Sequence, residues 1–363
     1  MKNELLYWLI LSSVKNLSIQ TKLKALAFLG SPAKVYEADR DYLLGVGFSP
    51  ANFEKLRSEA TKDDCRRIIE FCNKKRIKIL TIDDDEYPEM LKYIYDPPLV
   101  LYVRGNIPRM NSIAIVGSRR ASGYGIETAV KLSSQLALSG FMIVSGMARG
   151  IDTAAHCGAL KENGTTIAVL GCGVDIPYPP ENHSLMERII ESGAVISEYP
   201  PGTPPASFNF PGRNRIISGI SLGTLVIEAG LKSGSLITAK YALEQGREVF
   251  AVPGNINHYN SEGCNRLIKD GAKMVLDVDD IVEELNFGIV PARCGESGKK
   301  AAGQSLGKEA AMIISALRIE YLYDEQIAEK TDIPLKNLYE ILLDLELKGV
   351  VKKNLAGKYM LIT

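Results

Sequence analysis

The sequence lacks the cysteine and histidine patterns from which proteins build zinc sites and disulfide frameworks. Its cysteines and histidines are Cys65, Cys72, Cys157, Cys172, Cys264, Cys294, His156, His183 and His258. No two cysteines form a Cys-x-x-Cys pair, whereas structural zinc needs four closely set thiolate or imidazole ligands. We therefore expect no metal site and no disulfide framework.

An excess of either charge is also missing, because 43 lysines and arginines balance 43 aspartates and glutamates. This balance excludes a broad electrostatic field that would attract nucleic acid over the whole surface. A nucleic-acid partner would need basic groups that are gathered in one place.

Long apolar runs are absent as well. The N-terminal stretch MKNELLYWLILSS has its apolar residues at helical spacing and is too short to span a bilayer. It also lacks the small-residue cleavage site of a signal peptide. We expect a soluble protein of the reducing cytoplasm that makes no membrane contact.

A chain of 363 residues has room for two or three domains. Residues 1–60 have a helical pattern, broken twice at glycine, and predict an N-terminal helical domain. Residues 63–76 predict one more helix and residues 77–82 a short strand. Residues 83–106 contain several prolines, and we interpret them as a connector that wraps the surface of the next domain.

Residues 111–287 alternate between short apolar runs and helical patterns. The apolar runs are SIAIVG (112–117), FMIVSG (141–146), TIAVLG (166–171), AVISEY (194–199), TLVIEA (224–229), EVFAVPG (248–254) and KMVLD (273–277). Runs of this length, rich in Val and Ile, are typical of strands buried on both faces. The alternation predicts an α/β fold with a mainly parallel sheet and helices on both faces. Ligands would bind at the edge where the carboxyl ends of the strands meet.

The C-terminal part differs in composition. Residues 288–308 contain much Gly, Ser and Lys and few apolar residues, which predicts a flexible linker. Residues 309–363 contain three helical patterns and then two short apolar runs, which predict a β-hairpin. Three helices followed by a hairpin are typical of a winged helix-turn-helix domain. Its basic residues cluster only in the hairpin, so a structural or partner-binding role is at least as well supported as duplex recognition.

The Gly-rich segment GSRRASGYG (117–125) follows a predicted strand and leads into a helix. It matches neither the G-x-G-x-x-G fingerprint nor the Walker A motif. Its backbone N–H groups, the helix N-terminus and the side chains of Arg119 and Arg120 nevertheless suit a phosphate group. The alternative is a plain strand-to-helix turn with surface arginines.

Four residues near predicted strand ends could take part in catalysis. We interpret Asp152 as a helix cap rather than an acid, and His156 as a core residue. Cys172 has no partner histidine at a fixed spacing, so we do not expect a nucleophile. Glu228 would be the obvious carboxylate of a hydrolase, or it binds backbone N–H groups or pairs with an arginine.

The segment FNFPGRNRIISG (208–219) carries two arginines at the point where a proline-rich loop gives way to an apolar run. Cations at a helix start oppose the helix dipole, which indicates an anion nearby. The basic residues in or near predicted strand-end loops are Arg119, Arg120, Arg149, Arg213, Arg215, Lys232 and Lys240. They predict a basic pocket for phosphate within an otherwise neutral domain.

Several long segments resemble, in order, the signature blocks of the bacterial DNA-processing protein A family, also called DprA or Smf. The segments are GSRRASGYG, SGMARGID, AVLGCGVDIPYPPEN, ISEYPPG, FNFPGRNRIISG, VIEAGLKSGSLITAKYALEQGREVFAVPGN and GCNRLIKDGA. The resemblance covers about residues 60–287, and the flanking regions fit the layout of the family. Several long motifs in the same order are highly specific.

The resemblance implies an extended Rossmann-like domain over residues 61–287, preceded by a helical domain of the SAM or helix-hairpin-helix type. It implies a homodimer without catalytic activity or cofactor that binds and protects single-stranded DNA. Such proteins help to load the RecA recombinase onto incoming strands during natural transformation. The implied DNA-contacting residues are Ser118, Arg119, Gly171, Gly173, Arg213, Asn214, Arg215, Lys232, Ser233 and Lys240.

The residue types agree with this implication, because arginine forks grip phosphates and glycines let a strand approach closely. Phe208, Phe210 and Tyr178 could stack on bases, which would make binding tolerant of sequence. Core packing is the alternative for the two phenylalanines.

A second family shares part of the pattern. The turn after the first central strand, Gly223–Thr224 and Glu228 also resemble the phosphoribohydrolases, which cleave nucleoside monophosphates with a carboxylate. The Pro-Gly-Gly of that family is replaced here by SGISL, and the segment GRNRIISG belongs to the DNA-binding family instead. Hydrolysis with Glu228 is the alternative function.

Overall fold

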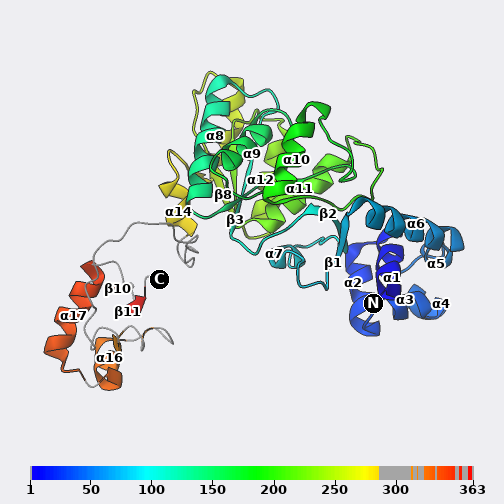
Figure 1. Ribbon diagram of the computed structural model, residues 1–363, viewed down its shortest axis with the longest axis horizontal. Coiled ribbons are helices and arrows are strands. Elements are labelled where there is room, and N and C mark those ends of the chain that lie inside the picture. Colours follow the sequence, from blue (N-terminus) through cyan, green and yellow to red (C-terminus); the bar gives the residue numbers. More distant parts are fainter. Residues whose placement is uncertain are drawn as a thin grey trace. The chain divides into compact units, whose positions relative to one another are not determined.

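The computed structural model (Figure 1) describes residues 2–285 and then residues 312–313, 317, 323–331, 333–347, 351–353 and 359–361. The chain divides into two compact units, and the first ends at Leu285. The predicted boundary at residue 60 falls inside this first unit and stays a prediction. The predicted linker, residues 288–308, lies outside the described residues.

The first unit begins with a group of helices, drawn in blue in Figure 1. They are α1 (Lys2–Ser13), α2 (Ile19–Leu29), α3 (Pro32–Glu37), α4 (Arg40–Val46), α5 (Pro50–Arg57) and α6 (Glu59–Lys75). Serine side chains accept hydrogen bonds from the first turns of α2, α3, α5 and α6 and so satisfy N–H groups that have no helical partner. Trp8 and Leu56 belong to the same apolar core as one face of the central sheet, so these helices pack as part of the unit.

A mixed sheet forms the centre of the first unit. Its strands are β1 (Lys78–Thr81), β2 (Val100–Gly105), β3 (Ser112–Gly117), β4 (Met142–Ser145), β5 (Thr166–Val169), β6 (Ala194–Ser197), β7 (Gly223–Ile227), β8 (Glu248–Ala251) and β9 (Lys273–Met274). In the described chain their order is β1-β2-β6-β5-β4-β3-β7-β8-β9. All neighbours from β6 to β9 are parallel. The prediction of a mainly parallel α/β sheet is confirmed.

The interpretation of residues 83–106 as a surface connector is wrong for their second half. After the short helix α7 (Glu89–Lys92), β2 pairs antiparallel with both β1 and β6 and extends the sheet. The first four residues of β2 are buried, as a strand inside a sheet requires. The prolines that precede this apolar run favoured the connector in the sequence, yet they end just before the strand begins.

Helices cover both faces of the sheet because alternate residues of a strand point to opposite sides. Ile113 and Ile115 of β3 pack with α8 (Gly123–Leu138) and α9 (Ile151–Lys161). Ala114 and Val116 belong to the core that includes α11 (Asn209–Ile220) and α12 (Gly234–Glu244). The remaining helical segments are η1 (Pro180–Asn182), α10 (His183–Ser192), η2 (Tyr259–Ser261), α13 (Glu262–Lys269) and α14 (Asp279–Leu285).

The order of the strands fixes where a ligand site can form. β3 pairs with β4 on one side and with β7 on the other. The strands from β4 to β6 are therefore added on one side of β3, and those from β7 onward on the other side. The loop after β3 runs into α8 on one face, whereas the loop after β7 runs into α12 on the opposite face. Loops that diverge in this way open a crevice outside the carboxyl ends of the two strands.

The second unit contains α16 (Asp324–Thr331), α17 (Leu335–Leu347) and an antiparallel pair of strands, β10 (Val351–Lys353) and β11 (Tyr359–Leu361). Buried apolar residues from both helices and from the pair form its core. The strand pair agrees with the predicted hairpin. Most of the first predicted helix of this region lies outside the described residues, so the winged helix stays a prediction.

Across the described ranges, no helix combines the length and the apolar character that crossing a bilayer requires.

Candidate nucleic-acid interface

A cleft of about 750 Å³ opens where the strand order reverses. Residues from the loops that follow strands β3 to β8, from α11 and from the first two turns of α12 form its walls. The predicted site residues that line this cleft are Ser118, Arg119, Arg213, Asn214, Lys232 and Ser233. The fold therefore gathers most of the predicted site from segments that are distant in sequence, at the sheet edge where ligands were expected.

Arg119 and Lys232, together with the exposed Arg120 beside Arg119, supply the accessible positive charge of this cleft at the reversal of the strand order, here called the switch-point cleft. Arg119 and Lys232 are both exposed, and neither has a carboxylate of a described residue within 4.0 Å of its charged nitrogens. The guanidinium carbon of Arg119 lies 5.2 Å from the centre of the Phe210 ring, which orients the side chain by a cation–π contact. These two cations lack an anionic partner within the described chain.

Arg213, unlike Arg119 and Lys232, is buried. It lies in the second turn of α11, which begins at Asn209. The residue is only 3% exposed. Its Nη1 donates to the carbonyl oxygen of Gly146 at 2.8 Å and to that of Val169, and its Nε donates to Asn214 Oδ1 at 3.2 Å. These acceptors are all uncharged, and Arg213 lines the cleft, so its contact with a phosphate stays a prediction. Of the three guanidinium nitrogens of Arg213, Nη2 has no hydrogen-bond partner among the described residues.

The three aromatic candidates differ in what their rings can still contact. Phe210 stacks on Tyr178 with ring centres 5.6 Å apart, and the guanidinium groups of Arg119 and Arg213 lie over it at 5.2 and 5.8 Å. These contacts orient the ring, but Phe210 is only partly buried and lines the cleft, so its stacking on a base stays a prediction. Phe208 precedes α11 and is 81% exposed, so its ring is available to a base.

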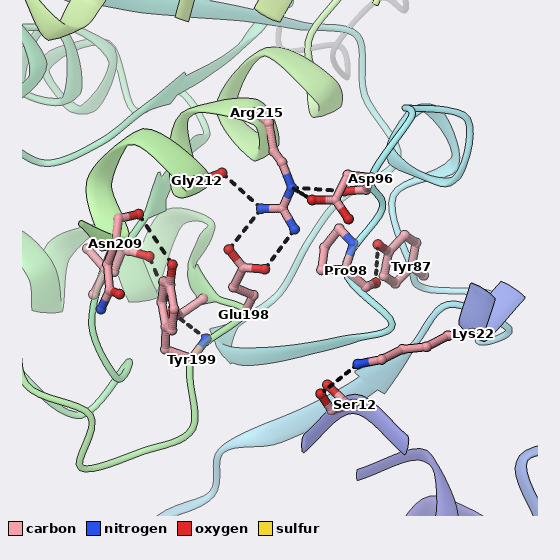
Figure 2. Close-up of polar contacts among 12 residues, drawn as sticks. Ser12, Lys22, Tyr87, Asp96, Pro98, Glu198, Tyr199, Asn209, Gly212 and Arg215 are labelled. Carbon is pink, nitrogen blue, oxygen red and sulfur yellow. Dashed lines mark hydrogen bonds and ion pairs between the residues drawn. The ribbon is translucent and has the colours of Figure 1, made fainter. Parts of the chain in front are cut away.

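Arg215 lies away from the cleft, in a separate polar cavity of about 200 Å³ that Lys22 also lines. Figure 2 shows its Nη1 and Nη2 bound to the two carboxylate oxygens of Glu198, at 2.8 and 2.7 Å. Its Nε also lies 3.1 Å from the carboxylate of Asp96. Burial disfavours the charge, but the two carboxylates outweigh it and raise the pKa of Arg215. The chain itself supplies the anion, and this placement does not support the predicted DNA contact.

The structure leaves three further predicted residues outside the cleft. Gly171 lines an adjoining hollow of about 20 Å³, where a Cβ atom would come within 2.8 Å of the Phe210 ring. A Cβ at Gly173 would lie 2.5 Å from the carboxylate of Asp175 and within 3.0 Å of backbone atoms of Pro200 and Gly202. Lys240 is exposed on α12, 3.6 Å from an acidic neighbour on the same helix. The two glycines thus make room for segments of the protein itself.

His156 and Cys172 are buried in ways that oppose catalysis, whereas the buried Asp152 lines the cleft. Asp152 is not the N-cap of α9, which is Gly150; its carboxylate accepts the backbone N–H four residues earlier at 3.3 Å. His156 is fully buried against Thr166, as predicted, and burial lowers its pKa to about 3. Burial raises the pKa of Cys172 to about 11, so no thiolate forms near neutral pH.

Glu228 lies directly after β7 and is only 8% exposed. Its carboxylate accepts hydrogen bonds from the backbone N–H of Ser122 at 2.8 Å and from the Ser122 hydroxyl. The prediction that this glutamate binds a backbone N–H group is confirmed. Glu228 is not among the residues that line the cleft.

The sequence analysis missed Tyr259 and Asn260, which line the cleft from the loop after β8. Tyr259 is 63% exposed, and Gly230 allows its close approach, since a Cβ there would lie 2.4 Å from the ring. The signal that could have found them is their place after a central strand. Over the described part of the chain, no group of three or more His, Cys, Asp or Glu side chains could hold a metal ion.

Comparison with known proteins agrees with this fold. Protein Smf of Synechocystis sp. is 40% identical over 297 residues, which cover 80% of this chain and 74% of that protein. The X-ray structure of DNA processing protein A from Streptococcus pneumoniae has a TM-score of 0.67 and 39% identity, and the match covers 78% of this chain and 98% of that chain. The structure of DNA processing protein A from Helicobacter pylori, which addresses its single-stranded DNA binding mode, has a TM-score of 0.52 and 30% identity and covers 58% of this chain and 96% of that chain.

The model of the family described as DNA recombination-mediator protein A matches residues 78–286. These residues include the whole parallel part of the sheet and every loop of the cleft. The chain belongs to the DNA recombination-mediator protein A family.

Proposed function

We propose that this protein binds single-stranded DNA in the switch-point cleft. The observation that carries the proposal is the pair of exposed cations, Arg119 and Lys232, which line the cleft without a carboxylate partner in the described chain. A phosphodiester backbone supplies the missing negative charge, because arginine and lysine are its usual ligands. The DNA processing protein A from Helicobacter pylori, whose binding of single-stranded DNA has been described structurally, supports this choice of ligand.

Less mobile groups add to the same surface. Nη2 of Arg213 offers a donor whose position is fixed by the bonds of the other guanidinium nitrogens. Ser233 caps α12, so the first N–H groups of that helix begin at the wall of the cleft. Helix N-termini and fixed donors suit phosphate oxygens, which every nucleotide presents.

Binding of this kind is tolerant of sequence. Phosphate contacts read no base, and the exposed ring of Phe208 stacks on any base with similar strength. The proposal therefore includes no preferred sequence.

We further propose that the bound strand is protected and handed to the RecA recombinase, and that the protein acts as a homodimer without catalytic activity. Membership of the recombination-mediator family supports this role. Nucleation of RecA on strands covered by a single-strand-binding protein should be faster when the chain is added. Sedimentation equilibrium should give twice the chain mass.

Hydrolysis of nucleoside monophosphates is the less supported function. The predicted reaction with Glu228 needs that carboxylate to face the substrate, whereas both of its oxygens accept hydrogen bonds from Ser122 outside the cleft lining. A hydrolase would also need a second group to activate water, and His156 is fully buried.

The test is the binding of labelled strands of poly-dT and of mixed sequence, titrated with salt. We expect similar affinities for both strands and a steep fall with salt, because phosphate contacts release condensed counterions. Strong preference for one sequence, or no binding, would contradict the proposal. In the absence of binding, release of free base from nucleoside monophosphates should be assayed.

A further inference from the structure

We propose that Glu228 is a positioning residue for DNA binding, and that its carboxylate fixes the turn Ser118–Ser122, here called the phosphate turn. The inference rests on the proposed function, since the phosphate turn carries Arg119. It gives a role to a buried carboxylate that the binding surface itself does not use.

Glu228 holds both ends of the phosphate turn. At the first end, the N–H of Ser118 donates to the backbone carbonyl of Glu228 at 2.8 Å. At the second end, the N–H of Ser122 donates to Oε2 of Glu228 at 2.8 Å, and the Ser122 hydroxyl donates to Oε1. Ser122 is also the N-cap of α8, since its Oγ accepts the N–H of Gly125 at 3.1 Å. The same contacts therefore fix the turn and the start of the helix.

Asn260 fastens the middle of the turn from the loop after β8. Its Nδ2 donates to the backbone carbonyl of Arg120 at 2.9 Å and lies 3.4 Å from Oε2 of Glu228. The carbonyl of Asn260 in turn accepts the N–H of Ala229 at 2.6 Å. The loops after β7 and β8 thus both form hydrogen bonds with the phosphate turn.

The space for the carboxylate comes from Gly125. A Cβ atom at this position would lie 2.6 Å from the carboxyl carbon of Glu228, closer than real atoms approach. By contrast, a Cβ at Gly123, in the same helical turn, would meet nothing within 4 Å. Glu228 also has a φ of 55°, a left-handed conformation that costs a non-glycine residue free energy. The strained backbone places both its carbonyl and its side chain against the turn.

This arrangement leaves the side chain of Arg119 unused by the turn that carries it. The hydrogen bonds that fix the turn in the described chain come from backbone groups and from the side chains of Ser118, Ser122, Glu228 and Asn260. Fixing the backbone in advance lowers the ordering cost of binding a phosphate, because the turn no longer has to be immobilised by the DNA. Loosening the turn should therefore weaken binding although no DNA contact is removed.

The experiment compares Glu228→Ala, Glu228→Gln and Gly125→Ala with the wild type and with Gly123→Ala as the matched control. We expect Glu228→Ala and Gly125→Ala each to weaken binding of a poly-dT strand about tenfold, as expected for lost buried hydrogen bonds. Gly123→Ala should bind like the wild type. Glu228→Gln should stay within about threefold of the wild type, because a glutamine can accept the Ser122 N–H and donate to its hydroxyl.

The double variant Glu228→Ala/Gly125→Ala gives the sharpest result. Alanine at position 125 then occupies the space that the carboxylate has left, so the second substitution should add almost nothing to the first. The proposed fixing of the phosphate turn by the Glu228 carboxylate is here called the brace. Additive losses of affinity, or a Glu228→Gln variant that binds as weakly as Glu228→Ala, would overturn it. Wild-type affinity in both Glu228→Ala and Gly125→Ala would also overturn it.

Hydrogen exchange of the free protein separates this inference from the proposed function. The amide of Ser122 should exchange at least about tenfold faster in Glu228→Ala and Gly125→Ala than in Gly123→Ala, because its acceptor is the Glu228 carboxylate, which the first variant removes and the second displaces. Unchanged exchange would overturn the brace whether or not DNA binds. Faster exchange in a protein that binds no single-stranded DNA would retain the brace and reject the proposed function.

Discussion

The guanidinium group of Arg215 is bound by both carboxylate oxygens of Glu198, at 2.8 and 2.7 Å, and the arginine is 8% exposed. Breaking such a buried pair leaves an uncompensated charge and costs about 3–5 kcal/mol. We therefore expect Arg215→Met and Glu198→Gln each to lower the free energy of unfolding by an amount of this order. Chemical denaturation followed by circular dichroism measures it.

The double variant is the control for that prediction. Its loss of stability should be smaller than the sum of the two single losses, since the second substitution removes the stranded partner. An Arg215→Met protein with wild-type stability but without DNA binding would contradict the structural role and place Arg215 on the DNA.

Phe208 should contribute to binding through its ring alone. Because it is 81% exposed, Phe208→Ala should leave the melting temperature unchanged and weaken binding of single-stranded DNA by about 1–3 kcal/mol. Tyr124 is a matched control. Phe208 lies between Ser207 and Phe210, which line the cleft, whereas neither Tyr124, which is 57% exposed at the start of α8, nor its neighbours Gly123 and Gly125 line it, so Tyr124→Ala should bind normally. Equal effects of the two substitutions in a fluorescence anisotropy titration would contradict the account.

The cavity beside Arg215 predicts a pH-dependent stability. Burial lowers the pKa of Lys22 from 10.5 to about 8, partly offset by Asp96. Between these values the unfolded chain binds more protons than the folded one, so the cost of the buried charge is full below pH 8 and vanishes as the pH rises to 10.5.

Lys22→Met removes this cost, at most about 3 kcal/mol from the size of the pKa shift. The stability gained by the variant over the wild type should be largest near pH 7 and shrink toward pH 10.5. The exposed Lys24 provides the control, since Lys24→Met should show no such trend. A difference that does not change with pH would contradict the buried charge.

The strands of the parallel sheet could be predicted because each is a continuous apolar run, such as Ile113–Val116. The partners of buried polar groups could not. Arg215 binds Glu198 and Asp96, and the latter lies 119 positions away, a separation that no local spacing reveals. The sequence therefore placed Arg215 among the DNA ligands, although it could have indicated only that this arginine needs an anion.

Contacts between segments that are distant in the sequence also limited the prediction of the cleft. The turn with Arg119 follows a clear strand and was found, whereas Tyr259 and Asn260 lie in a loop whose composition is ordinary. Their proximity to the turn follows from the pairing of β7 with both β3 and β8, which is a property of the sheet order. Glu228 was recognised as a carboxylate at a strand end, but only the fold shows that Ser122 is its partner.

The most direct measurement compares two lysines near the ends of α12. Lys232 lines the cleft, whereas Lys240 is exposed and lies 3.6 Å from Glu244 on the same helix. Poly-dT binding should be titrated with salt for Lys232→Ala, Lys240→Ala and Arg119→Ala. The account predicts that Lys232→Ala and Arg119→Ala each weaken binding and reduce the salt slope by about 0.7, as one lost phosphate contact requires, while Lys240→Ala leaves both unchanged. An equal loss in Lys240→Ala, or wild-type binding in all three variants, would contradict the placement of DNA in this cleft.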